Sequence, residues 1–274
     1  MSDARMSGRG LSRFALPMAA AFGFAVLYVP LAIMVIYSFN ASKLASVWGG
    51  WSVQWYGELL RNDQILQAAW VSLKVAAMSA TLGTIFGCLI GYAMSRFGRF
   101  RPRLLLSGMA TAPIVMPDVV TGLSLLLLFI SMEALLGWPA ERGVDTIVIA
   151  HATFCMAFVA VIVQARLTDV DTSVEEAAMD LGARQPRVFF DVTLPMMAPA
   201  LVAGWLLSFT LSLDDLVIAS FVSGPGASTL PMVVFSKVRL GVTPEINALA
   251  TLLIVLVSIF VALAAWRMRK AGKA

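Results

Sequence analysis

The chain has 274 residues, of which 59% are hydrophobic and 13% charged, and its formal net charge at pH 7 is +4. A composition this apolar is typical of integral membrane proteins and excludes a soluble globular core. The basic residues form no module with aromatic residues, so no nucleic-acid partner is expected. Continuous apolar runs without a period of two favour helices over a barrel, and we therefore predict an all-α, polytopic membrane protein.

Six apolar runs are long enough to cross the hydrocarbon core of a bilayer, which takes about 20 residues of helix. They lie at about residues 14–39, 65–94, 104–131, 147–165, 196–222 and 248–266. The first run follows three arginines, but it is too long for the apolar part of a signal peptide, so we interpret it as a span. We expect a single transmembrane domain over residues 1–274.

Basic residues are concentrated at alternate ends of these runs. They lie before the first run, between the second and third, between the fourth and fifth, and after the sixth: Arg5, Arg9, Arg13, Arg96, Arg99, Arg101, Arg103, Arg166, Arg184, Arg187, Arg267, Arg269, Lys270 and Lys273. Cytoplasmic loops of membrane proteins carry an excess of Lys and Arg. We therefore predict that both termini and the connection between spans four and five face the cytoplasm.

The first outer loop, residues 40–64, is rich in aromatic residues, among them Trp51 and Trp55. Ring faces attract ammonium groups, so one interpretation is an aromatic platform for a cationic substrate. The other interpretation, which we prefer, is a short helix held at the outer interface by its aromatic residues.

Two prolines interrupt the third run, in the stretch Ala112-Pro-Ile-Val-Met-Pro-Asp118. Proline removes a backbone donor and breaks a helix, which a membrane protein tolerates where the freed groups face protein or water. Pro117 suits the first turn of a second half-helix, which would place Asp118 at the positive end of the helix dipole. Asp118 is then either a capping carboxylate or a charged group that lines a translocation path.

The only histidine, His151, lies in the fourth run. The sequence offers no second ligand type near it, and catalysis or metal binding would need such partners. We therefore expect His151 to be a hydrogen-bonded packing residue, and we expect neither a metal nor a cofactor in this chain.

The connection between the fourth and fifth runs is polar. Ser173 can cap a helix whose first turn carries Glu175 and Glu176, which suits the positive end of the helix dipole. Gly182 can take the left-handed conformation that ends a helix. A second short helix is expected at about residues 187–192, before the next apolar run. The pattern therefore predicts an amphipathic helix–turn–helix between two membrane spans.

Two adjacent carboxylates, Asp214 and Asp215, lie about 20 residues beyond Pro195 in the outer half of span five. Neighbours on a helix point about 100° apart, so one can line a path while the other is buried in packing. Two carboxylates this close resist full ionisation unless a cation is present. The pair is either a receiver for an organic cation or a structural polar pair at a helix interface.

The polar connection also resembles the coupling loop of ABC-importer permeases, in which E-A-A, a glycine and L-P recur at fixed spacing. The matching residues are Glu176, Ala177, Ala178, Gly182, Val192, Leu194 and Pro195, with Val192 in place of the usual isoleucine. This resemblance implies a loop at about residues 172–195 that couples the permease to an ATPase. The expected coupling surface also includes Glu175 and Asp180.

A second resemblance covers the chain from span one to span six. The stretches 112–118 and 214–226, together with Trp55-Tyr-Gly-Glu-Leu-Leu60, are similar to permeases of polyamine importers, and within them to the second permease of putrescine importers. The resemblance implies the type I importer permease fold in a bacterial inner membrane. It also implies a second permease as heterodimer partner, a nucleotide-binding ATPase dimer and a periplasmic binding protein. The expected substrate path comprises Asp118, Asp214, Asp215, Trp51 and Trp55.

The chain contains no P-loop of the G-x-x-x-x-G-K-[ST] type, so we expect a transport subunit whose ATP is hydrolysed by another chain. Spermidine, or another cation such as ferric iron, is an alternative substrate. A rival from another class is an intramembrane aspartyl enzyme that uses Asp118 with Asp214 or Asp215, although other catalytic motifs are missing. A passive channel is a third possibility, against which the coupling loop argues. Purification with or without an associated ATPase would separate these alternatives.

Overall fold

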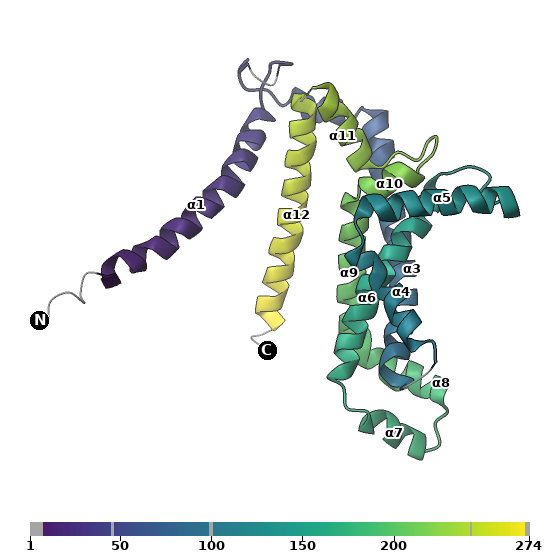
Figure 1. Cartoon of the computed structure of the whole chain (residues 1–274). Helices are drawn as coiled ribbons and strands as arrows, with labels where there is room; N and C mark the ends of the chain where they lie inside the picture. The colour runs from purple at the N-terminus through teal and green to yellow at the C-terminus, as the bar shows by residue number, and fades with distance from the viewer. Residues whose placement is uncertain (1–7, 45–46, 99–100, 242, 272–274) are drawn as a thin grey trace, which may run out of the picture. The chain divides into compact units, whose positions relative to one another are not determined.

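The computed structural model describes residues 8–44, 47–98, 101–241 and 243–271, with side chains between residues 17 and 259 of those ranges. The regular structure in these ranges is helical (Figure 1). Its elements are α1 (Gly8–Tyr37), α2 (Gln54–Leu59), α3 (Asp63–Arg96), α4 (Arg103–Val115), α5 (Asp118–Leu136), α6 (Val144–Thr168), α7 (Ser173–Asp180), α8 (Gln185–Val188), the π-helix η1 (Phe189–Thr193), α9 (Leu194–Asp214), α10 (Val217–Val222), α11 (Leu230–Leu240) and α12 (Pro244–Ala271). The chain forms two compact units, residues 1–66 with 234–274 and residues 67–233.

The first unit contains α1, α2 and α12, and α12 contacts both of the others. Trp55 of α2 is 5% exposed, and its indole Nε1 donates a hydrogen bond of 2.6 Å to the backbone oxygen of Asn40. Glu245 of α12 accepts hydrogen bonds from Asn62 at 2.6 Å and from Lys237 at 3.0 Å. These bonds tie the loop after α1 to α2, and the end of α2 to the start of α12.

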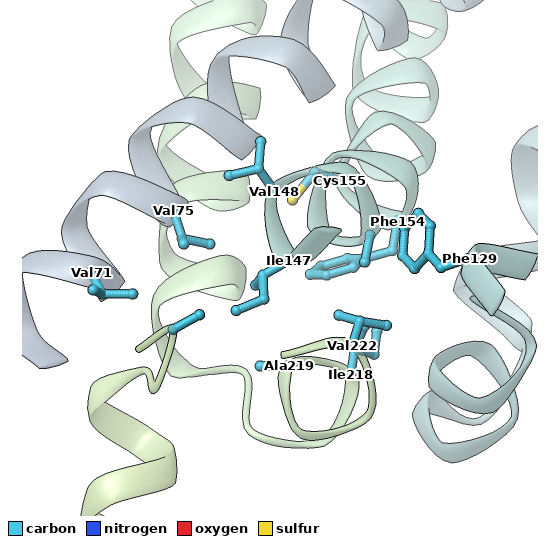
Figure 2. Packing of buried hydrophobic residues seen from close by; sticks show 12 residues of the cluster. Val71, Val75, Phe129, Ile147, Val148, Phe154, Cys155, Ile218, Ala219 and Val222 are labelled. Atoms are coloured by element: carbon cyan, nitrogen blue, oxygen red, sulfur yellow. The ribbon is translucent and has the colours of Figure 1, made fainter. Parts of the chain in front are cut away.

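The central helix of the second unit is α6, which contacts α4, α5, α9 and α10 and is buried on most sides. A helix that is apolar all round must be covered by other helices. The hydrophobic core around α6 contains side chains from α3, α5, α6 and α10, as Figure 2 shows: Val71, Val75, Phe129, Ile147, Val148, Phe154, Cys155, Ile218, Ala219 and Val222.

Three glycines spaced four residues apart allow α3 to approach α6 closely. A Cβ atom added at Gly83, Gly87 or Gly91 would lie between 2.6 and 2.8 Å from an atom of α6. Residues four apart share one face of a helix, and small residues on such a face let two membrane helices pack backbone to backbone. The glycine face of α3 therefore sets the distance between these two helices.

Five described helices are long and apolar enough to cross a membrane: residues 17–37 of α1, then α3, α5, α6 and the continuous helix Gln185–Asp214. Two shorter apolar helices are α4 and the stretch Pro244–Ile259 of α12. All six apolar runs of the sequence therefore correspond to helix, as expected, although the third run is divided between α4 and α5 and the fifth between α9 and α10.

The division of the third run follows from Pro117 alone, because Pro113, which we also expected to break the helix, lies inside α4. α4 ends at Val115, α5 begins at Asp118, and Met116 and Pro117 are extended between them. A residue before proline avoids the helical conformation, which explains why α4 stops ahead of Met116. Pro117 is the N-cap residue of α5, one position before the helical turn where we expected it. Figure 1 shows α5 running across the direction of α4 and α6 instead of extending α4.

Gly87→Ala is expected to lower the free energy of unfolding by about 1–3 kcal/mol, because overpacking a filled helix contact is destabilising. The added methyl group would lie 2.6 Å from Cβ of Val159. Thermal unfolding of the purified permease in detergent, followed by circular dichroism, measures the effect.

Gly108→Ala is the matched control for this prediction, since nothing lies within 4 Å of a Cβ at that position of α4. Alanine is the better helix former, so this variant should melt at or slightly above the wild-type temperature. Equal melting temperatures for the two variants would contradict the proposed role of the glycine face.

Candidate functional site

A cavity of about 400 Å³ lies where two helices of the second unit are broken, between α4 and α5 and between α9 and α10. Phe154 and Phe158 of α6 contribute apolar walls to it. Asp118, Asp214 and Asp215, the three carboxylates that stood out in the sequence, all line this cavity. The fold thus brings together acidic groups from two distant parts of the chain.

Asp215 is largely buried and forms hydrogen bonds within the protein. Its side chain is 10% exposed, and its Oδ2 accepts a hydrogen bond of 2.8 Å from the backbone N–H of Ala219. Its Oδ1 accepts a longer bond of 3.4 Å from the N–H of Ile218. Both donors belong to the first turn of α10, whose free N–H groups need acceptors. Asp215 therefore caps α10 from the edge of the cavity.

His151 lies behind Asp215 and is fully buried. Its Nε2 is 3.1 Å from Oδ2 of Asp215, an ion-pair distance without the alignment of a hydrogen bond. Its Nδ1 is 2.7 Å from Oγ of Ser212. The expected hydrogen-bonded packing residue is therefore found, but sequence reasoning missed its partners, because His151 lies on α6 and both partners follow much later in the chain.

Asp118 and Asp214 differ from Asp215 in having no ion pair with any basic side chain that the structure describes. Both are exposed. Asp118 is the first residue of α5, where the positive end of the helix dipole favours a carboxylate. Of the adjacent aspartates, Asp214 is thus open to the cavity and Asp215 is largely buried; the cause is not the expected angle between helical neighbours, because α9 ends at Asp214 and Asp215 is extended.

The two tryptophans of the expected path belong to the first unit, whereas the three carboxylates belong to the second. The buried ring of Trp55 is held by Asn40, so it serves the local packing of α2. Trp51 is 73% exposed and meets Trp48 edge to face, with ring centroids 5.0 Å apart. The short helix that we preferred on sequence grounds is α2.

The connection between α6 and α9 begins with the amphipathic helix α7. Ser173 is its first residue and not its cap, contrary to expectation; Thr172 holds the N-cap position without a side-chain hydrogen bond. The carboxylate of Asp171 instead accepts a bond of 3.0 Å from the N–H of Ser173, which lowers the pKa of Asp171 below its ordinary value. Gly182, after the end of α7, has a φ of +87°, the left-handed conformation that the pattern predicted.

The second short helix differs from the expectation. It begins at Gln185 and continues through the π-helix η1 directly into α9, so no separate helix ends before Pro195. Proline lacks an N–H and clashes with the carbonyl four residues earlier in an α-helix. A π-turn just before Pro195 accommodates the ring without ending the helix.

A buried polar cluster holds α7 against the helices of the second unit. The carboxylate of Glu175, whose side chain is 9% exposed, lies 3.0 Å from Nε of Arg96 at the end of α3. It also accepts a hydrogen bond of 3.0 Å from Oγ1 of Thr193 in η1. The guanidinium of Arg96 donates further to the backbone oxygens of Leu167, at 3.1 Å, and Val170, at 3.4 Å. We refer to Arg96, Glu175 and Thr193 as the polar node.

The other expected coupling residues face outward. Glu176, Ala177, Asp180, Gly182 and Pro195 are exposed. Ala178 is half-buried. Glu175 is therefore the one member of the expected set that is turned into the protein. No group of His, Cys, Asp and Glu residues suited to a metal ion is found in the part of the chain that the structure describes.

Solved structures with a similar fold are ABC transporters. The chain matches a protein in the crystal structure of a bacterial ABC transporter involved in the import of the acidic polysaccharide alginate, with a TM-score of 0.70 and 19% identity over 94% of this chain and 96% of that one. It also matches a chain of the MetNI methionine ABC transporter in an inward-facing conformation, with a TM-score of 0.61 and 17% identity over 76% and 95% of the two chains.

Relatives found by sequence comparison share a higher sequence identity with the chain than these solved structures do. The putrescine transport system permease protein PotI of Escherichia coli (strain K12) is 59% identical over 92% of this chain and 89% of its own length. The spermidine/putrescine transport system permease protein PotC of the same strain is 45% identical over 85% and 86%. The sulfate transport system permease protein CysT of that strain is 31% identical over 89% and 90%.

Residues 83–270 match the family described as binding-protein-dependent transport system inner membrane component. That stretch contains the polar node, the connection between α6 and α9 and all three carboxylates of the cavity. The chain therefore belongs to this family of inner-membrane transport components and has the fold of an ABC-importer permease.

Proposed function

We propose that the chain is the permease subunit of an ATP-driven importer that moves polyamines, putrescine above all, from the periplasm to the cytoplasm. This proposal rests on which of the cavity carboxylates have partners within the chain and which do not. Asp118 and Asp214 have no described basic partner, whereas Asp215 is occupied by α10 and His151. The relatives named for putrescine and for spermidine/putrescine support the same substrate class.

The physical argument concerns desolvation. An unpaired carboxylate among membrane helices costs several kcal/mol in practice, so it is favoured only where water or a cation can meet it. Putrescine carries two ammonium groups joined by methylenes. The cavity offers two open carboxylates, Asp118 and Asp214, with apolar walls that include Phe154 and Phe158. Its volume of about 400 Å³ is in the range of small-molecule sites.

The rest of the machinery belongs to other chains in this proposal. A second permease completes the membrane domain, a periplasmic binding protein delivers the substrate, and an ATPase dimer docks on the coupling loop. The outward-facing residues of that loop, from Glu176 to Gly182, suit such a contact, and Leu181 among them is 90% exposed. The distribution of Lys and Arg supports a cytoplasmic location for both termini and the loop.

Spermidine is the second candidate substrate, since one relative is named for spermidine and putrescine together. The family also includes a sulfate permease, so membership alone does not fix the sign of the substrate's charge. The two open carboxylates disfavour an anion here. The aspartyl-enzyme alternative has no support among the three relatives described above, which are all named as transport permeases.

Asp214→Asn keeps the size of the side chain and removes its charge. We expect putrescine uptake per assembled complex to fall about tenfold or more, because losing one charge-paired contact costs a few kcal/mol. Asp118→Asn should have a smaller effect in the same direction. Asp215→Asn should instead lower the amount of complex recovered, since Asp215 caps α10. Radiolabelled putrescine uptake, divided by the amount of complex, provides the measurement.

Glu133→Gln serves as control, because Glu133 is an exposed carboxylate of α5 that does not line the cavity. Its uptake should match the wild type. If all three aspartate variants keep uptake within about twofold of the wild type, the carboxylates are not the cation path.

Gly182→Val should abolish transport while the membrane helices still insert. A β-branched residue at a φ of +87° strains the turn after α7 by about 1–3 kcal/mol and displaces the docking surface. Gly182→Asn is the matched control, because asparagine tolerates this conformation, and it should retain most transport. The measurement compares uptake with co-purification of the ATPase, and equal transport by the two variants would contradict the role of the turn.

Asp180→Cys should be shielded from membrane-impermeant thiol reagents in intact cells and should react after the membrane is permeabilised. Asp180 is exposed at the end of α7, so burial in the permease does not protect it. Labelling from outside the intact cell would reverse the proposed topology of the loop and of both termini.

A further inference from the structure

The polar node joins the end of α3 to the end of α6, to α7 and to η1. Arg96 lies at the end of α3, Glu175 in α7 and Thr193 in η1. Nη1 and Nη2 of Arg96 donate to backbone oxygens of Leu167 at the end of α6 and of Val170 just after it. Because the guanidinium is planar and rigid, these bonds and the contact to Glu175 fix the position of α7 relative to α6.

The node is also connected to the cavity by a single continuous helix. Thr193 is the last residue of η1, and α9 runs from the next residue to Asp214 at the cavity. A helix of 21 residues is about 30 Å long, and α9 is continuous over this length although Pro199 lies within it. A displacement of α7 that reaches Thr193 is therefore carried along α9 to the carboxylates.

Burial distinguishes the node from the other ion pair of the same loop. The side chains of Arg96 and Glu175 are 12% and 9% exposed, whereas those of Arg187 and Asp191 are 77% and 61% exposed. A buried ion pair is a poor source of stability, because desolvation cancels most of its attraction, yet removing one partner leaves an uncompensated charge. The buried pair of Arg96 and Glu175 therefore fixes the position of α7 more than it adds to the free energy of unfolding.

We propose that Glu175 is a positioning residue for transport: through Arg96 and Thr193 it transmits the displacement of α7 to α9 and thus to the cavity. This inference rests on the proposed function, in which an ATPase moves the coupling loop. Glu175 differs in this role from its outward-facing neighbour Glu176, which is free to meet the ATPase.

The test follows the far end of α9 during the ATPase cycle, without any transported substrate. Thr210→Cys places a thiol at an exposed position of α9. The native thiols, Cys88 and Cys155, are both buried, so they will not compete for the reagent. The full importer is purified with its ATPase, and the rate of maleimide labelling at position 210 is compared with and without ATP and vanadate.

The informative variants are Glu175→Gln and Thr193→Val, each in the Thr210→Cys background. Thr193→Val is nearly isosteric and removes the hydroxyl that bonds Glu175 at 3.0 Å and also lies 3.4 Å from the backbone oxygen of Val188. We expect both variants to lose the nucleotide-dependent change in labelling rate, which the wild-type complex shows. Thr193→Val should keep complex recovery and basal ATP hydrolysis within about twofold of the wild type, whereas Glu175→Gln should also lower recovery, because it leaves the buried charge of Arg96 uncompensated. Thr193→Ser keeps the hydroxyl and should restore the change.

Arg187→Gln is the control, since it removes the exposed ion pair of the same loop and should leave the labelling change intact. The inference is overturned if Glu175→Gln and Thr193→Val respond to nucleotide like the wild type. It is also overturned if labelling change, ATP hydrolysis and recovery fall in parallel in Thr193→Val, which removes no charge, because the node then serves assembly alone. The inference is overturned as well if the labelling rate of the wild-type complex is the same with and without ATP and vanadate.

Putrescine uptake is measured after the same preparations are reconstituted into sealed lipid vesicles, to separate the two proposals. Suppose that the wild-type complex shows the labelling change and the node variants lose it, but no putrescine is imported. The proposed substrate is then wrong, whereas the proposed role of Glu175 is supported. If wild type and node variants import putrescine equally well, the proposed substrate is supported and the proposed role of Glu175 is wrong.

Discussion

The close contact between α3 and α6 is the constraint on which the second unit depends. Gly83, Gly87 and Gly91 bring the two backbones together, and α6 is then covered on its remaining sides by α4, α5, α9 and α10. Lipid chains give no hydrophobic drive for helices to associate, so backbone proximity and dispersion must supply it. With α6 fixed, the breaks in its neighbours come to lie against Phe154 and Phe158, where the cavity forms.

Broken helices explain why polar groups collect at this cavity. Met116 and Pro117 interrupt one helix pair, and Asp215 and Leu216 interrupt the other. Each break frees backbone groups that lipid cannot satisfy, so it must face protein or water. Asp215 meets this requirement by accepting hydrogen bonds from the first turn of α10. This explains why Asp215 has a structural role while Asp214 stays open to the cavity.

Much of the architecture was predictable because its signals are local. The apolar runs, the proline break before Asp118 and the left-handed Gly182 follow from short stretches of sequence, and the structure confirms them. The contacts of His151 with Asp215 and of Arg96 with Glu175 were not predictable, since each joins residues that only the packed fold brings together. The role predicted for Ser173 was wrong for a different, local reason, because the carboxylate of Asp171, two residues earlier, accepts the hydrogen bond of the N–H of Ser173 at the helix start.

The π-helix between α8 and α9 has a consequence for the angular orientation of the coupling loop. A π-turn holds about one residue more than an α-turn, and each residue of a helix advances the chain by about 100° around the axis. The direction in which α7 and α8 project from α9 is thus set by the number of residues between Phe189 and Thr193. Deleting one residue of this turn would rotate α7 and α8 by about 100° around the axis of α9, while the helices on either side of the turn stay formed.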